Sequence, residues 1–322
     1  MVKYLIILLD DTSVSFCHYD NSFKERNLIP IEKLKEGILF AMKENLSIQY
    51  ILPNYSLPKE YIELMECIDN VKIVPSEIKT LNETDIVVLN NWESNYPFER
   101  DRTYVLRITK EDLKKNQEEI KNSLKDIYRL NIVITNINNF YNSDFEDYKT
   151  ILDSFSEEIK SLMRSKNNIS QLNILTDRLT LDSMNNCNAG YENITLAPDG
   201  KFYICPAFYH TNKCESIFKK DDFCIGDLKK GVDIKNPQLY KIDYAPICRN
   251  CDAYQCKRCI WLNVNSTCEI NTPSHEQCVI AHLERNASRT LLNDIRNYGE
   301  FIPDKEIKEI DYLDPFDVKN EW

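Results

Sequence analysis

Glycine is scarce in this chain of 322 residues. There are six glycines in all, and Gly37 is the only one that precedes Gly190. Phosphate-binding loops and dinucleotide fingerprints need glycines after a strand, because only glycine lets the backbone approach the ligand closely. We therefore exclude nucleotide binding of these kinds for the residues before Gly190.

The chain also lacks an excess of positive charge and any hydrophobic run of membrane-spanning length. Its net charge is −11 at pH 7, so we expect no basic surface for nucleic acid. The apolar run at the start is short and ends at Asp10-Asp11 without a small-residue cleavage site. It predicts a buried strand and not a signal peptide, so we expect a cytoplasmic protein without a membrane partner.

Cysteine, in contrast, is abundant. The chain has twelve cysteines, and ten of them lie between Cys187 and Cys278. In a reducing compartment this number favours metal ligation over disulfides. The densest group is Cys248-Arg-Asn-Cys251, followed after four residues by Cys256-Lys-Arg-Cys259. Two such pairs suit an iron–sulfur cluster or a tetrahedral zinc ion, and the spacing alone does not separate the two.

The first part of the chain alternates between apolar runs and segments with helical spacing. This order predicts an α/β fold, with a parallel sheet that is open or curved as a partial barrel and helices outside it. The expected strands are Lys3–Leu9, Ser47–Leu52, Val71–Val74, Asp85–Leu89, Thr103–Ile108, Asn131–Thr135 and Gln171–Thr176. The expected helices are Ile31–Asn45, Pro58–Ile68, Lys110–Asp126 and Asp144–Ser165.

The cysteine-rich part has a different pattern. Ile194–Ala197 and Lys201–Cys205 flank Pro198-Asp199-Gly200, which predicts a hairpin. Between Cys256 and Cys278 we expect loop and short helix held by metal and not by a hydrophobic core. The histidines near the cysteines each have the chemistry to complete a site or to orient a ligand; they are His210, His275 and His282.

The spacing of these cysteines resembles that of a known family. Cys187 is followed by twelve residues, Gly200, four residues and Cys205, then by the two Cys-x-x-Cys pairs and by Cys278. This pattern is similar to the SPASM domain of radical SAM peptide maturases. The resemblance implies a degenerate radical-SAM-like partial (β/α) barrel over residues 1–180 and a SPASM-like iron–sulfur domain over 181–290. By its composition, the remaining segment over 291–322 is an acidic tail.

The resemblance also implies metal ligands for one or two 4Fe-4S clusters. It assigns three cysteines to a first cluster, namely Cys187, Cys205 and Cys259. It assigns four to a second cluster, namely Cys248, Cys251, Cys256 and Cys278. The first cluster then has an open iron, or its fourth ligand is one of three further cysteines, namely Cys214, Cys224 and Cys268. We assign no catalytic residue from the sequence.

The chain departs from this family where the family binds S-adenosylmethionine. After the first strand it reads Ser13-Val-Ser-Phe-Cys17-His-Tyr-Asp20, so two of the three cysteines of the CxxxCxxC motif are replaced. After the second strand it reads Pro53-Asn-Tyr-Ser-Leu-Pro58, where the family has a Gly-Gly-Glu-Pro turn. One thiolate does not hold a cluster that binds this cofactor, so we expect no cleavage of S-adenosylmethionine by this chain alone.

The resulting expectation is an accessory or maturase protein of ribosomal-peptide (RiPP) modification. It would bind auxiliary 4Fe-4S clusters and either a precursor peptide or an active radical SAM partner. One alternative is an iron–sulfur enzyme that acts on peptide thiols through an open iron. Another alternative is a zinc-binding structural or interaction protein.

Overall fold

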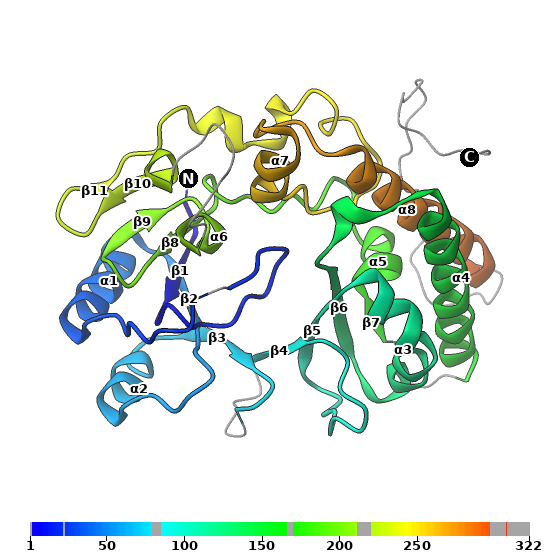
Figure 1. The fold of residues 1–322 in the computed structure, drawn as a ribbon, viewed down its shortest axis with the longest axis horizontal. Helices are drawn as coiled ribbons and strands as arrows, with labels where there is room; N and C mark the ends of the chain where they lie inside the picture. Colours follow the sequence, from blue (N-terminus) through cyan, green and yellow to red (C-terminus); the bar gives the residue numbers. More distant parts are fainter. Residues whose placement is uncertain are drawn as a thin grey trace. The chain divides into compact units, whose positions relative to one another are not determined.

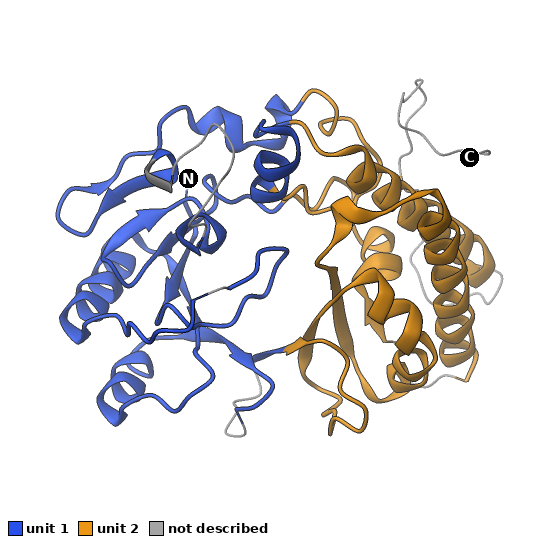
Figure 2. Cartoon of the chain, viewed as in Figure 1, with its two compact units in different colours: residues 1–88, 187–245, 260–271 blue, residues 89–186, 246–259, 272–322 orange. Residues whose placement is uncertain are grey.

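The computed structural model describes residues 2–21, 23–78, 85–165, 170–210, 220–296 and 307. Contacts divide the chain into two compact units (Figure 2). Unit 1 comprises residues 1–88, 187–245 and 260–271, and unit 2 comprises residues 89–186, 246–259 and 272–322. This division interleaves segments from the barrel-like and the cysteine-rich parts. The domain boundaries at 180 and 290 stay a prediction, and nearly all of the acidic tail lies outside the described residues.

Unit 1 contains the parallel sheet predicted for the start of the chain. Its centre is β1 (Tyr4–Leu8), which pairs in parallel with β2 (Ser47–Ile51), and β2 pairs in parallel with β3 (Asn70–Pro75). The first strand is buried along most of its length, as its continuous apolar run predicts for a covered parallel sheet. Two crossover helices, α1 (Ile31–Glu44) and α2 (Lys59–Met65), connect these strands (Figure 1).

The predicted hairpin joins this sheet on the other side of β1. Strand β8 (Asn193–Leu196) pairs in parallel with β1 and antiparallel with β9 (Lys201–Tyr203). Gly200 has φ +82° in the connecting turn, a conformation that residues with a Cβ rarely adopt. Two strands that the sequence pattern did not indicate, β10 (Cys224–Asp227) and β11 (Gly231–Val232), extend the antiparallel part.

Unit 2 contains further parallel strands of the sheet and the helices that follow them. Strand β5 (Thr103–Ile108) pairs in parallel with β6 (Arg129–Ile134), and β6 pairs with β7 (Gln171–Leu172). Strand β4 (Ile86–Asn90) pairs with β3 and crosses the boundary between the units.

Three long helices belong to unit 2: α3 (Lys110–Ser123), α4 (Asn142–Arg164) and α8 (His275–Arg296). Helix α3 begins where Thr109 Oγ1 accepts a hydrogen bond from the Asp112 N–H. Helices α4 and α8 lie side by side (Figure 1). This pairing makes α8 part of the unit's core packing.

The strand predicted over Gln171–Thr176 is wrong in its second half, which forms the short helix α5 (Asn173–Thr176). The side chain of Asn173 accepts from the Ile132 N–H at 2.8 Å and donates to the Ile132 carbonyl at 3.0 Å. This amide therefore replaces the backbone as the partner of β6, and strand pairing stops at Leu172.

The segment between Cys256 and Cys278 also differs from expectation. It includes α7 (Ile260–Thr267), a helix of unit 1, and both Ile260 and Val264 belong to the hydrophobic core of that unit. Core packing, and not metal alone, therefore holds α7.

Replacing Ile260 by Ala tests this packing. Ile260 is 2% exposed, so we expect the variant to lower the free energy of unfolding by about 2–5 kcal/mol. The loss should be the same with and without bound metal. Urea unfolding of both forms checks it, with Asn265→Ala at an exposed position of the same helix as the control. A stability loss confined to the metal-loaded form would contradict core packing of α7.

Candidate metal centre

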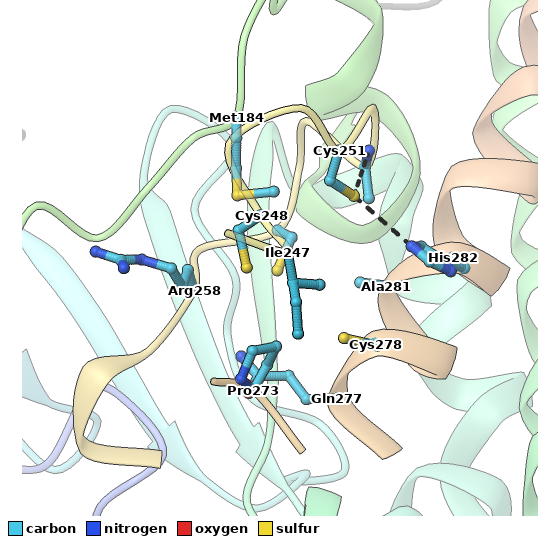
Figure 3. Close-up of a pocket in the computed structure, with 12 residues that line it drawn as sticks. Met184, Ile247, Cys248, Cys251, Arg258, Pro273, Gln277, Cys278, Ala281 and His282 are labelled. Carbon is cyan, nitrogen blue, oxygen red and sulfur yellow. Dashed lines mark hydrogen bonds between the residues drawn. The ribbon is translucent and has the colours of Figure 1, made fainter. Parts of the chain in front are cut away.

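The four cysteines that the family resemblance assigned to the second site line one cavity in unit 2. They are Cys248, Cys251, Cys256 and Cys278. The cavity encloses about 380 Å³ of space between atoms, including the part open to solvent. The sulfurs of Cys248, Cys251 and Cys278 are visible around it in Figure 3. Residues distant in sequence therefore contribute thiols to the same space.

Two elements position these thiols. Cys248, Cys251 and Cys256 lie on the loop over residues 246–259, where the Cys251 N–H donates to the Cys248 carbonyl and the Cys256 N–H donates to the Ala253 carbonyl. These tight turns bring side chains of the loop back to one side. Cys278 comes from the first turns of α8. Cys278, Ala281 and His282 are spaced three and four residues apart, so one face of α8 borders the cavity.

A buried network of ion pairs holds the loop that carries the thiols, and we call it the Asp252 network. Asp252 is 0% exposed, and its Oδ1 accepts from Arg285 Nη1 at 2.9 Å. Arg178 Nε donates to the Asp252 carbonyl at 3.0 Å, and Arg289 Nη2 donates to Asp252 Oδ2 at 3.3 Å. Arg178 and Arg285 are themselves fully buried. Removing one partner of such a network leaves an uncompensated buried charge. The ion pairs therefore strongly restrain Asp252, the residue next to Cys251.

Cys251 and Cys256 are protonated thiols at neutral pH when no cation is bound. Burial raises the pKa of Cys251 to about 12, and burial raises the pKa of Cys256 well above its ordinary value. Arg285 opposes this effect on Cys251, because its positive charge favours the thiolate. A thiolate becomes stable here when a bound cation replaces the proton.

Within the described part of the chain, no group of three or more His, Cys, Asp or Glu side chains is arranged to hold a metal ion as it stands. The described cysteines are thiols and not disulfides. The four cysteines line the same cavity. Thiolates are the soft ligands that iron–sulfur clusters and zinc prefer, so the donor set fits either group chemically.

The cysteines assigned to the first site divide between the units. Cys187 and Cys205 pack against the core of unit 1, whereas Cys259 belongs to unit 2. Of the three candidates for a fourth ligand, Cys224 lies on β10 and Cys268 ends α7 at φ 58°. Cys214 lies outside the described residues. The first site therefore stays a prediction.

The loop after β1, where the family binds its cofactor cluster, is held by its own polar groups. Ser13 is 0% exposed, and its hydroxyl donates to the Ile51 carbonyl at 2.9 Å and accepts from the Asp10 N–H. Asn21 Nδ2 donates to the carbonyls of Asp11 and Ser13 at 2.7 Å each. The residue at the first motif position is therefore committed to backbone structure, whereas Asp20 is exposed.

The three histidines have different surroundings. His282 lines the cavity, with its Nε2 3.6 Å from Cys251 Sγ. His275 is exposed at the start of α8, and His210 is buried in unit 1, where its ring stacks on that of Tyr19. Sequence spacing did not separate them. The available signal was that His282 follows Cys278 by four residues. If a helix begins before Cys278, both side chains lie on the same face of it.

Sequence reasoning also missed Glu284, which lies between α4 and the cysteine loop. Tyr148 Oη donates to Glu284 Oε1 at 2.7 Å, and Gln255 Nε2 donates to Glu284 Oε2 at 3.4 Å. Burial raises the pKa of Glu284 to about 7, although both hydrogen bonds favour the carboxylate. Glu284 therefore joins α4 to the cysteine loop through a carboxyl group whose pKa is raised.

Comparisons with known proteins support the fold. No family model matches the chain, and no curated protein matches its sequence. The solved structure of anSMEcpe with bound AdoMet is similar with a TM-score of 0.62 at 11% identity, over 92% of this chain and 96% of that chain. The structure of anSMEcpe with bound AdoMet and Cp18Cys peptide has a TM-score of 0.61 at 13% identity, over 92% and 99%.

A third structure, Streptococcus suis SuiB bound to precursor peptide SuiA, has a TM-score of 0.47 at 13% identity, over 85% of this chain and 75% of that chain. The agreement with anSMEcpe confirms the predicted fold class. This chain has a mixed α/β fold similar to that of the two anSMEcpe structures. None of the described helices is long and apolar enough to cross a membrane.

Glu284 predicts a specific pH dependence of stability. Its pKa is about 7 in the folded protein against an ordinary value of 4.5, so the folded state binds more protons between these values. The free energy of unfolding should therefore fall by roughly 3 kcal/mol as the pH rises from about 4.5 to about 7, and this contribution should stay constant above that.

The variant Glu284→Gln removes this contribution. Urea midpoints across the same pH range should show the variant gaining stability relative to the wild type as the pH rises. Glu146→Gln, at an exposed position of α4, serves as the control. Parallel pH profiles for wild type and Glu284→Gln would show that Glu284 titrates at its ordinary pKa.

Proposed function

We propose that this chain is a maturase or accessory protein of ribosomal-peptide modification that carries an auxiliary 4Fe-4S cluster in unit 2. The observation that carries the proposal is the gathering of four cysteine thiols around one cavity. A 4Fe-4S cluster takes one thiolate on each of its four irons, so its ligands surround a volume. Zinc thiolates instead meet at one ion, with sulfurs roughly 3.8 Å apart for bonds of about 2.3 Å.

The residues that would hold the cluster are Cys248, Cys251, Cys256 and Cys278. When bound, such a group supplies one-electron transfer. The chain's own contribution is a loop held by buried ion pairs and a helix face that presents the fourth thiol. The mostly apolar walls of the cavity restrict water around the cluster site, which is one of the factors that set the potential of such centres.

The proposal further holds that this chain does not cleave S-adenosylmethionine by itself. Two of three motif cysteines are absent, and the hydroxyl of Ser13 is engaged with the backbone of β2. The barrel-like part would then bind a precursor peptide or an active radical SAM partner. The two anSMEcpe structures of similar fold contain bound AdoMet, and one of them also contains a peptide, which supports a peptide as the ligand class.

The ligand assignment is tested by cysteine replacement under anaerobic conditions. The double variant Cys248→Ala, Cys251→Ala should lose about four irons and four sulfides per chain relative to the wild type. Cys67→Ala is the matched control, because Cys67 is exposed and its thiol donates to the Glu63 carbonyl in unit 1. Unchanged iron and sulfide contents in the double variant would refute the assignment, and zinc without sulfide in the wild type would favour the structural zinc alternative.

The absence of cofactor cleavage is tested by a turnover assay. The reconstituted chain, incubated alone with S-adenosylmethionine and a strong reductant, should form no 5′-deoxyadenosine above the level without protein. An active radical SAM partner and a precursor peptide added to the same mixture are the positive condition. Stoichiometric 5′-deoxyadenosine from this chain alone would overturn this part of the proposal.

A further inference from the structure

His282 lies at the cysteine cavity without having been assigned to the metal site. It is 3% exposed on α8, and its Nε2 is 3.6 Å from Cys251 Sγ. Cys278 precedes it by one helical turn, so both side chains border the same cavity. Figure 3 shows the imidazole directed toward the sulfur of Cys251. This is a contact between a potential N–H donor and a predicted ligand.

The proximity of His282 to Cys251 is set by other bonds and not by their own contact. The segment that carries Cys251 is fixed to α8 by other bonds: Arg285 Nη1 donates to Asp252 Oδ1 at 2.9 Å, and Gln255 Nε2 donates to the Ala281 carbonyl at 2.8 Å. These bonds attach two residues that follow Cys251 in the loop to two residues that flank His282 on α8. The backbone therefore presents the imidazole to the sulfur in advance, as expected of a residue that orients a ligand.

The chemistry of the pair changes when metal is bound. In the thiol form, either the S–H or the imidazole N–H is able to donate. A metal-bound thiolate has no proton, so its sulfur only accepts, and His282 then has to donate from Nε2. A hydrogen bond to a ligating sulfur draws electron density from it and stabilises the cluster state with the additional electron.

We propose that His282 is a positioning residue of the metal centre, which donates its Nε2–H to the Cys251 thiolate and thereby raises the reduction potential and the retention of the cluster. This inference rests on the proposed function. The four cysteines do not supply this hydrogen-bond donor, because all four are used as ligands. His282 acts through Cys251 and not on iron directly.

A different geometry is consistent with the same distance. Two ligands of one tetrahedral zinc ion, a thiolate at about 2.3 Å and an imidazole at about 2.0–2.1 Å, have their donor atoms roughly 3.6 Å apart. Direct ligation by His282 is therefore the competing outcome. Nitrogen hyperfine coupling to the paramagnetic reduced cluster distinguishes ligation of iron from a hydrogen bond, and zinc, which has no unpaired electron, is recognised by metal analysis.

The test compares His282→Leu with His282→Gln in the full chain, reconstituted anaerobically. His282→Leu removes the donor, and His282→Gln keeps an N–H donor at a similar distance from the backbone. His275→Leu, at an exposed histidine of the same helix, is the control. The readouts are the midpoint potential from a redox titration followed by electron paramagnetic resonance, the rate of iron loss to a chelator, and the nitrogen hyperfine coupling.

We expect His282→Leu to lower the midpoint potential. If the hydrogen bond favours the reduced state about tenfold, the shift is about 59 mV for one electron. We expect cluster retention to fall about 10- to 100-fold, the usual effect of losing a residue that orients a ligand. His282→Gln should recover part of both effects, and His275→Leu should match the wild type.

Two results overturn the inference while leaving the proposed function intact. One is a loaded His282→Leu variant with the potential and retention of the wild type. The other is a nitrogen coupling of ligand strength in the wild type that disappears in the variant. A wild-type protein without iron and sulfide overturns both the proposed function and the inference, and it is recognised before any variant is made.

Discussion

The buried charge of Asp252 is the constraint on which the cysteine site depends. The carboxylate and backbone of Asp252 accept hydrogen bonds from Arg285 on α8 and from Arg178, and none of the three side chains is exposed. A buried carboxylate is tolerated only when it is paired, so the loop over residues 246–259 has to stay against α8. The thiols on that loop consequently line the same cavity as the thiol of Cys278. The same ion pairs thus stabilise the fold and position the thiols of the site.

The two compact units illustrate two ways of holding a cysteine-rich segment. In unit 1, Cys187 and Cys205 pack against a hydrophobic core to which α7 also contributes. In unit 2, the cysteine loop is held mainly by polar bonds to Asp252 and Gln255. A loop held by directional bonds keeps its thiols at defined positions before a metal arrives. Such preorganisation favours a cofactor whose ligands have to be spread around it.

The sequence predicted elements that depend on local patterns. It did not predict features that depend on contacts between residues far apart in the chain. Thr103–Ile108 was predicted with both of its ends, because it is an apolar, β-branched run followed at once by the N-cap Thr109. Gln171–Thr176 was half wrong, because Asn173 pairs its side chain with Ile132 some forty positions away. The family resemblance grouped the four cysteines that line one cavity, and their role as metal ligands stays a prediction. The contact of His282 with Cys251 depends on the tertiary fold, which the spacing of the cysteines does not contain.

The central claim is that the cysteine cavity holds a sulfur-ligated iron cluster and not a single ion. X-ray absorption at the iron and zinc edges of protein prepared without oxygen tests it most directly. The account predicts an iron edge with sulfur neighbours and an iron–iron scattering shell, which the Cys248→Ala, Cys251→Ala variant reduces. A sample that shows only zinc with sulfur or mixed sulfur and nitrogen neighbours, and no iron–iron shell, would contradict it.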